Sequence, residues 1–370
     1  MKFLTLLLCF VCSVAVLACS NEGDDDQNLR MNQIQVLGTH NSYHIQPRDA
    51  LLQGIASLES QAFADSLEYT HLPLREQLDR DVRQLELDVF ADPEGGLYAT
   101  RIGLVFIGED PASGLPELDA PGMKVLHIQD IDFETHCLTL QICLEQLKGW
   151  SDEHSDHLPI TVMIGAKDDP IPVPGAAVPV PFGPDEMDDI DEEILAVFPA
   201  EQLITPDDVR GDYATLEQAV LDGNWPRLRE ARGRVMFVLL DEGDARDHYV
   251  DGHPSLEGRV MFTNSEEGKP EASWFKVDNA LDDGERIREL VEAGYMVRTR
   301  ADEDTQQARD DDYTLQEAAF ESGAQFTVTD YVVPNPDFGT EYQAAVPGGT
   351  PARCNPISAP DPCRSELIAP

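Results

Sequence analysis

The sequence predicts an α/β fold of the (β/α)8 TIM-barrel type, with loop insertions that distort its regular form. Eight short apolar or β-branched runs recur along the 370 residues. Segments with helical periodicity separate several of them, and such alternation is typical of a parallel sheet. Eight strands over this length favour a closed barrel over an open sheet.

The predicted elements follow one another along a single domain, residues 31–370. The strands are 34–40, 84–90, 124–128, 159–164, 234–240, 259–263, 294–300 and 325–330, and the helices are 72–80, 139–150, 185–198, 284–293 and 313–322. Gly294 and Gly323 introduce the last two strands, as helix-ending glycines would. Residues 91–122, with room for a small hairpin, and the Pro-rich residues 168–186 are interpreted as insertions. The tail from Pro334 is rich in Pro and Gly.

The N-terminus has the pattern of an export signal. Residues 1–18 contain an early lysine, an apolar run and small residues, which predicts a signal peptide. VLAC resembles a bacterial lipoprotein processing box, with Cys19 as the first mature residue and lipid anchor; an ordinary cleaved signal is the alternative. Residues 19–30 then form an acidic tether. Since Ser20 rather than an aspartate follows Cys19, we expect a membrane-anchored lipoprotein of the outer membrane or cell surface.

Four further cysteines agree with export to an oxidising compartment. The natural bridges join the neighbours Cys137 to Cys143 and Cys354 to Cys363, although other connectivities stay open. No CxxC pair occurs among them, which disfavours a zinc site.

The charge limits the possible partners. A formal net charge of −44 repels nucleic acid and anionic lipid, so we expect no nucleic-acid binding. We expect a soluble, monomeric barrel attached to the membrane through its N-terminal lipid.

Polar side chains gather where the predicted strands end. They are His40, Asn41, Glu86, Asp88, His127, Lys167, Arg298, Arg300, Asp330 and Tyr331. Functional groups of a (β/α)8 barrel lie at the C-terminal ends of its strands. Glu86 and Asp88 are spaced i, i+2, so both side chains face one side of their strand; the same holds for the two arginines.

This set has a consistent chemistry. Two carboxylates and an asparagine oxygen suit Ca²⁺, with Mg²⁺ as the alternative cation. Two histidines from different strands can act as general base and general acid. Lys167 and the two arginines can hold a phosphate. The set predicts metal-assisted cleavage of a phosphodiester.

Each feature also has a structural interpretation. A histidine after a strand often serves the fold, the ELD run can be an exposed edge, and RTR can be surface charge. Their coincidence at successive strand ends favours a site. We expect His154 and His157 to be solvated and His136 to be structural, while His44 either lines the pocket or makes a loop contact.

Several motifs resemble a known family when taken in order. LGTHNSYH (37–44), LELDVF (85–90), VLHIQDIDF (125–133), GYMVRTRADE (294–303), SGAQFTVTDYVVP (322–334) and RCNPISAP (353–360) resemble the secreted, calcium-dependent bacterial phosphatidylinositol-specific phospholipases C. The resemblance runs from about residue 34 to residue 363.

The resemblance implies specific roles. His40 is similar to the general base and His127 to the general acid, while Asn41, Glu86 and Asp88 are similar to the calcium ligands. The implied reaction is attack of the inositol 2-hydroxyl on phosphorus, which releases diacylglycerol and leaves a cyclic inositol phosphate. We expect substrate contacts from Lys167, Arg298, Arg300 and Tyr331.

One position departs from the family pattern. Relatives supply a further glutamate from the fourth strand, where this chain has Gly165. The alternatives are that Asp168, Asp169 or water fills that place, or that the metal is bound weakly.

Two other functions remain open at this stage. A glycerophosphodiester phosphodiesterase uses a related barrel and site, but its first strand ends in an HR dipeptide, whereas this chain has His40-Asn41. A surface lipoprotein that keeps the barrel only as a binding scaffold is the non-enzymatic alternative.

Overall fold

The computed structural model describes residues 29–368 of the chain. The predicted signal peptide, Cys19 and nearly all of the predicted tether lie outside the described residues. Within the described part, no helix has both the length and the apolar character needed to cross a bilayer.

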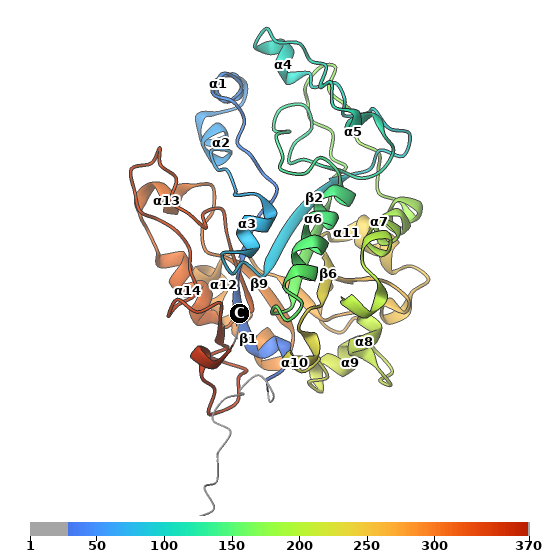
Figure 1. The fold of residues 1–370 in the computed structure, drawn as a ribbon, viewed down its shortest axis with the longest axis vertical. Coiled ribbons are helices and arrows are strands. Elements are labelled where there is room, and N and C mark those ends of the chain that lie inside the picture. The colour runs from blue at the N-terminus through green and yellow to red at the C-terminus, as the bar shows by residue number, and fades with distance from the viewer. Residues whose placement is uncertain (1–28, 369–370) are drawn as a thin grey trace, which may run out of the picture.

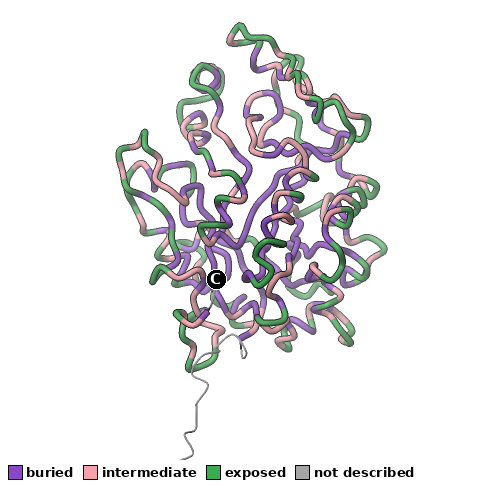
Figure 2. The backbone as a smooth tube through the Cα atoms, in the orientation of Figure 1, coloured by how far each residue is buried: buried purple, intermediate pink, exposed green. Residues whose placement is uncertain are grey.

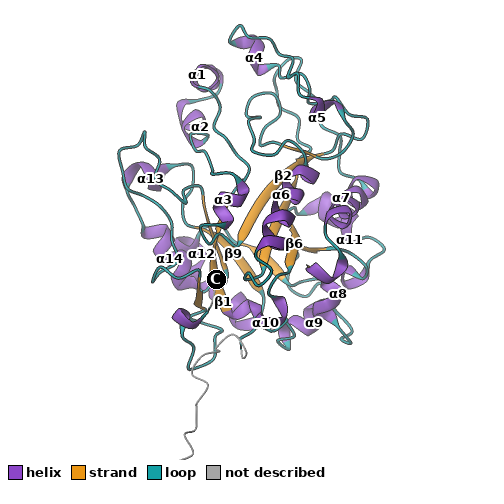
Figure 3. Cartoon of the chain, in the orientation of Figure 1, coloured by secondary structure: helices purple, strands orange, loops and turns teal. Residues whose placement is uncertain are grey.

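Within residues 29–368, eight parallel strands follow one another in a ring at the centre of the molecule (Figure 3). In ring order they are β1 (Ile34–Thr39), β2 (Gln84–Phe90), β4 (Ile160–Ala166), β6 (Val235–Leu239), β7 (Met261–Thr263), β8 (Trp274–Lys276), β9 (Met296–Arg300) and β10 (Phe326–Thr329). β10 pairs with β1, and a parallel bridge between Asn264 and Trp274 joins β7 to β8. The predicted (β/α)8 barrel is therefore confirmed, in a distorted form.

The distortion lies at two weak seams of the ring. Among the described residues, β7 and β8 meet only through their bridge, and β1 and β2 share the single register pair of Gly38 and Gln84. A Cβ atom at Gly38 would lie 2.8 Å from the Gln84 Cβ and 1.9 Å from its Oε1. Only glycine therefore fits at this seam.

One predicted barrel strand is wrong, and one real strand was missed. Residues 124–128 contain only the short β3 (Lys124–Val125), which pairs antiparallel with the end of β2 and lies off the ring. A short apolar run carries no information about strand direction, which explains the error. The missing barrel strand is β8, whose three residues are too few to show a period. Two further strands, β5 (Leu203–Ile204) and β11 (Ala352–Cys354), pair with β6 and β1.

Helices surround the strands (Figures 1 and 3). They are α1 (Asp49–Leu58), α2 (Gln61–Ser66), α3 (Leu74–Leu78), α4 (Gly103–Phe106), α5 (Pro116–Asp119), α6 (Leu140–Glu153), α7 (Pro184–Val197), α8 (Pro206–Arg210), α9 (Leu216–Leu221), α10 (Leu228–Ala231), α11 (Gly243–Val250), α12 (Ala280–Ala293), α13 (Gln306–Asp310) and α14 (Thr314–Ser322). All five predicted helical segments contain a helix. Gly294 and Gly323 end α12 and α14 with φ of 108° and 91°, as predicted.

Burial separates the strands from the outer faces of the helices (Figure 2). All seven residues of β4 and all five of β6 are buried, as expected for strands covered on both faces. α6 buries Leu140, Leu144 and Leu147 along one side, and the Thr139 hydroxyl caps it by accepting the Ile142 N–H. Helix spacing and capping therefore place α6 as the sequence predicts.

The insertions rise above the end of the barrel at which β2 ends (Figure 1). Residues 91–122 hold α4 and α5, with a lone antiparallel bridge between Thr100 and Ala112 where a hairpin was expected. The Pro-rich segment is an extended loop up to α7. Asp130 ties the two insertions together, because its carboxylate accepts the N–H groups of Ile102 and Ala177.

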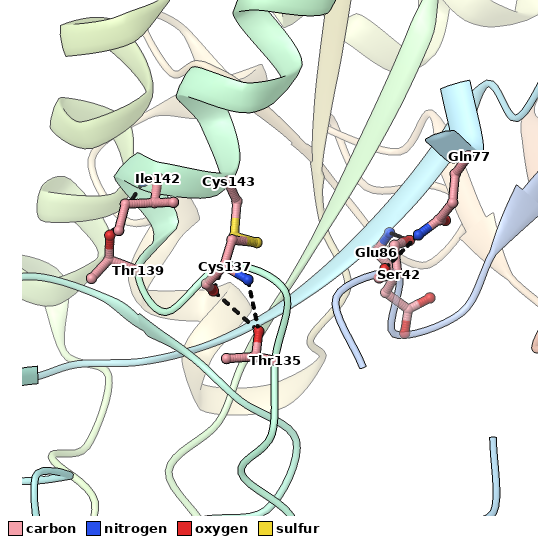
Figure 4. Close-up of a disulfide and its surroundings, with 8 residues drawn as sticks. All are labelled: Ser42, Gln77, Glu86, Thr135, Cys137, Thr139, Ile142 and Cys143. Atoms are coloured by element: carbon pink, nitrogen blue, oxygen red, sulfur yellow. Dashed lines mark hydrogen bonds between the residues drawn. A yellow bond between two sulfur atoms is a disulfide. The ribbon is translucent and has the colours of Figure 1, made fainter. Parts of the chain in front are cut away.

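The two predicted disulfides are confirmed. Cys137 bonds to Cys143 at the start of α6, with Cα atoms 5.2 Å apart (Figure 4), and Cys354 bonds to Cys363 in the tail. The expected exposure of His157 is wrong: its ring is buried, and Nε2 lies 2.8 Å from the Ser151 hydroxyl. Because His157 lies in a polar run, the sequence did not reveal that its side chain turns inward. His154 is exposed, as expected.

We predict that Gly38→Ala lowers the free energy of unfolding by about 1–3 kcal/mol, because the new methyl group overpacks the β1–β2 seam. Urea denaturation measures the effect. Gly54→Ala in α1 is the matched control, since nothing lies within 4 Å of its Cβ position. The control should be neutral or stabilising by up to ~1 kcal/mol. Equal stabilities of the two variants would contradict the steric argument.

Candidate active site

A cavity of about 500 Å³ opens at the C-terminal ends of the barrel strands. It is lined by His40, Glu86, Asp88, Gly165, Lys167, Leu240, Asp241, Glu242, Asn264, Lys276, Asp278, Arg298 and Arg300. Six of the residues predicted from strand ends are thus brought to one hollow. The sequence placed these six correctly because short apolar runs marked where the strands end.

The turn after β1 is tied to β2 (Figure 4). The Ser42 hydroxyl accepts the backbone N–H of Glu86 at 2.8 Å, and the Gln77 side chain donates to the Ser42 carbonyl at 2.7 Å. Asn41 takes a left-handed φ of 47° in this turn. The connection fixes Asn41 relative to the carboxylates of β2, across the seam that has few ladder bonds.

His40 is oriented by a carboxylate from the end of β10. Its Nδ1 lies 2.9 Å from Asp330 Oδ1, and the other oxygen of Asp330 accepts from Arg300 at 2.9 Å. A carboxylate only accepts, so Nδ1 carries the proton and donates. The free Nε2 then lies 3.8 Å from Glu86 Oε1. Asp302 supports Asp330 from behind by accepting its backbone N–H at 2.8 Å.

His127 is oriented in the same way by a second carboxylate. It follows the antiparallel β3, and its Nδ1 lies 2.6 Å from Asp132 Oδ2. The chain returns through a tight turn in which Asp130 has φ of 70°. Asp132 also bonds the fully buried His44 at 2.9 Å, whose ring stacks on Tyr69 with centroids 4.0 Å apart. His44 therefore supports the site from behind.

The two predicted catalytic histidines have opposite pKa shifts. Burial lowers the pKa of His40 well below its usual value, and Arg300 adds to this against the opposing charge of Glu86. Burial also acts to lower the pKa of His127, but the hydrogen bond and charge of Asp132 outweigh it and raise that pKa. Burial would raise the pKa of Asp132, yet its two histidine partners hold it at about 2. Two histidines whose pKa values are shifted in opposite directions suit the roles of general base and general acid.

Two of the three predicted metal ligands, Asn41 and Asp88, present a hard oxygen atom without a protein partner. Asn41 Oδ1 and Asp88 Oδ1 are buried and have no hydrogen-bond donor within the described chain. Such buried acceptors are costly unless something binds them. Their other atoms are held: Asn41 Nδ2 donates to the Tyr69 hydroxyl at 2.9 Å, and Asp88 Oδ2 accepts from Tyr43 at 3.1 Å. The donor set fits a hard cation such as calcium.

Cationic side chains balance both carboxylates of β2. Arg298 donates to Glu86 Oε2 at 3.0 Å and also pairs with Asp278. The Lys167 ammonium lies 3.3 Å from Asp88 Oδ2. The site therefore carries its own counter-charges in the absence of a metal.

Four of the ten residues predicted from strand ends are not among those that line the cavity: Asn41, His127, Asp330 and Tyr331. The first three are joined to the site by the contacts above, whereas the Tyr331 ring is buried in a cluster with Tyr69 and Tyr342. The two alternatives to the missing glutamate are also not among the lining residues. Asp168 accepts the N–H of Phe182, and Asp169 is exposed in the Pro-rich loop. Sequence reasoning left the role of His44 open and missed three supporting residues: Asp132, Asp302 and His71, whose Nε2 lies 2.7 Å from the His40 carbonyl oxygen. An aspartate five positions after His127 was a usable signal for one of them.

The sequence profile described as "Phosphoinositide phospholipase C, Ca2+-dependent" matches residues 29–356. The chain belongs to this family. Its expected calcium dependence and its expected nature as a phosphodiester-cleaving enzyme are thereby confirmed, which leaves the non-enzymatic scaffold without support. No curated protein matches the chain.

Solved structures of phosphoinositide phospholipases C share the fold. The calcium-dependent phosphoinositol-specific phospholipase C of Pseudomonas sp. aligns with 18% identity and a TM-score of 0.52, covering 89% of this chain and 96% of that one. The calcium-dependent enzyme of Streptomyces antibioticus aligns with 17% identity and a TM-score of 0.52, covering 82% of this chain and 95% of that one. At these identities the likeness shows the fold.

We predict that Asp132→Asn lowers the pKa of His127, because it removes the charge that outweighs the effect of burial. NMR titration of the imidazole protons in metal-free protein measures this pKa. Asp330→Asn is the matched control, since it removes the partner of His40 instead. An unchanged His127 pKa in Asp132→Asn would contradict the assigned cause.

Proposed function

We propose that this family member cleaves phosphatidylinositol to diacylglycerol and a cyclic inositol phosphate, with His40 as general base and His127 as general acid. The observation that carries the proposal is the pair of histidines, each oriented by its own carboxylate, beside Glu86 and Asp88. The family match supports the phosphoinositide head group.

In the first half of the reaction, His40 takes the proton of the attacking hydroxyl. Because the Nδ1–H group of His40 donates a hydrogen bond to Asp330, the proton stays on Nδ1 and the lone pair of Nε2 is available toward the cavity. The lowered pKa of His40 keeps the ring neutral, as a base must be. The deprotonated 2-hydroxyl oxygen forms the new bond to phosphorus within the same inositol phosphate.

In the second half, His127 donates a proton to the departing glycerol oxygen as the bond from phosphorus to that oxygen breaks. Asp132 accepts from Nδ1, so the proton on Nε2 is the one transferred. The raised pKa of His127 favours the charged ring that an acid requires. The proton gained by His40 and the proton lost by His127 balance over the step.

Positive charge holds the phosphate. Arg300 and Lys167 line the cavity and are proposed to contact the phosphoryl oxygens, whereas Arg298 is engaged with Glu86 and Asp278 and orients that glutamate. Bound calcium, held by Asn41, Glu86 and Asp88, would lower the pKa of the attacking hydroxyl and offset charge on the phosphoryl group.

We predict that His40→Ala and His127→Ala each lower kcat/KM by roughly 10²- to 10⁴-fold. Their double variant should lose less than the product, because residues that act in one proton-transfer cycle are not additive. The pH profile of the parent should be bell-shaped. The exposed His154→Ala serves as control and should keep full activity. Losses below tenfold in both single variants would refute the assigned roles.

Product analysis tests the substrate. Phosphatidylinositol and glycerophosphodiesters are compared with calcium and with excess chelator, and phosphorus NMR identifies the cyclic product. A cyclic inositol phosphate formed only with calcium supports the proposal. Turnover restricted to glycerophosphodiesters, yielding glycerol phosphate, would support the glycerophosphodiesterase instead.

We also propose that the chain is exported and anchored through lipid on Cys19, as a single barrel after a signal peptide. Support comes from the VLAC sequence and the polar residues that follow it. We predict that Cys19→Ala leaves the signal uncleaved or releases the protein from membranes. Fractionation with intact-mass analysis measures both outcomes. Normal processing and membrane retention of the variant would contradict the anchor.

A further inference from the structure

Gly165 changes the shape of the cation site as well as its ligands. It stands in β4 directly opposite Asp88 of β2 in the sheet register. A Cβ atom at Gly165 would lie 2.3 Å from Asp88 Oδ1, so this oxygen occupies the space that a side chain from β4 would need. In this arrangement the missing carboxylate cannot come from β4. Asp88 Oδ1 nevertheless remains a buried acceptor without a donor.

A carboxylate from the next strand borders the same place. Asp241 follows β6, which pairs with β4 on the side away from β2. Its Oδ2 accepts the backbone N–H of Ala166, the residue after Gly165, at 2.7 Å. Asp88 and Asp241 thus flank Gly165 from the two neighbouring strands, and all three residues line the cavity.

The Lys167 ammonium shows where a cation is favoured. It lies 3.3 Å from Asp88 Oδ2, and Asp88, Glu86 and Asp241 are the carboxylates whose charges act on it. The neighbouring Glu242 is engaged elsewhere, because its Oε1 accepts from Asn264 at 2.9 Å. The ammonium beside Asp88, in the cavity that Glu86 and Asp241 also line, occupies a position in which a metal ion would gain the same attraction.

We propose that Asp241 supplies the third carboxylate of the calcium site in place of the one absent at Gly165, and that Lys167 holds this cation position in the metal-free chain. The inference rests on the proposed function only in its assumption that the cation bound at this site is calcium. Calcium then competes with an internal ammonium for Asp88, which is freed from Lys167 when the metal binds.

The test is calcium binding without substrate, measured by isothermal titration calorimetry on metal-free protein. Asp241→Asn keeps an oxygen that accepts the Ala166 N–H, so the fold should persist; thermal unfolding in chelator checks this. We expect calcium affinity to fall at least tenfold. Glu242→Gln, the adjacent cavity carboxylate, is the matched control and should stay within about threefold of the parent. Parental affinity in Asp241→Asn, or a larger loss in Glu242→Gln, would overturn the assignment.

Lys167→Met provides the opposite change. Removing the competing ammonium should raise calcium affinity severalfold, while weaker binding than in the parent would overturn its role as competitor. Because no lipid is present, these results are independent of the reaction. A chain with the expected calcium affinities but no turnover of phosphatidylinositol would refute the proposed function and leave the assignment of Asp241 in place.

Discussion

Buried ionised groups at the mouth of this barrel must find their counter-charges within the protein, because burying an unpaired charge costs several kcal/mol. Asp330 lies between His40 and Arg300, and Asp132 lies between two histidines. Asp330 fixes Nδ1 of His40 as a donor, and Asp132 does the same for Nδ1 of His127. Satisfying the buried charges and orienting the two proposed catalytic histidines are therefore the same structural task.

The distortion of the barrel is what brings the second histidine to the first. His40 ends a ring strand, but His127 follows β3, a branch that leaves the outer end of β2 in antiparallel pairing. The branch turns back through Asp130, so the aspartate that orients His127 lies only five residues away. A regular β/α unit of the barrel would have a helix after β2 in place of this branch. The chain would then not return to the mouth of the barrel within a few residues.

The sequence allowed the fold and six of the thirteen cavity residues to be predicted, because strands buried on both faces read as apolar runs, as in β4 and β6. The sequence could not reveal whether residues 124–128 run parallel or antiparallel to their neighbour. The three residues of Trp274–Lys276 are too few to show the alternation typical of a strand. The spacing of five residues from His127 was a signal for Asp132, whereas the role of Asp302 depends on a contact between distant elements that no spacing signals. Tyr331 follows β10 directly, yet its ring packs among other tyrosines away from the cavity.

The charge balance of the site determines what calcium does here. Glu86 and Asp88 already have protein cations as partners, so the metal-free chain is not left with two bare buried carboxylates. Calcium held by these residues, as proposed, would exchange partners with Arg298 and Lys167 at the mouth of the barrel. The Oδ1 atoms of Asn41 and Asp88 differ, because neither has a donor in the described chain. In the proposed site both atoms would gain a partner when the metal binds, and calcium affinity would depend on the difference between a lysine ammonium and a divalent ion at Asp88.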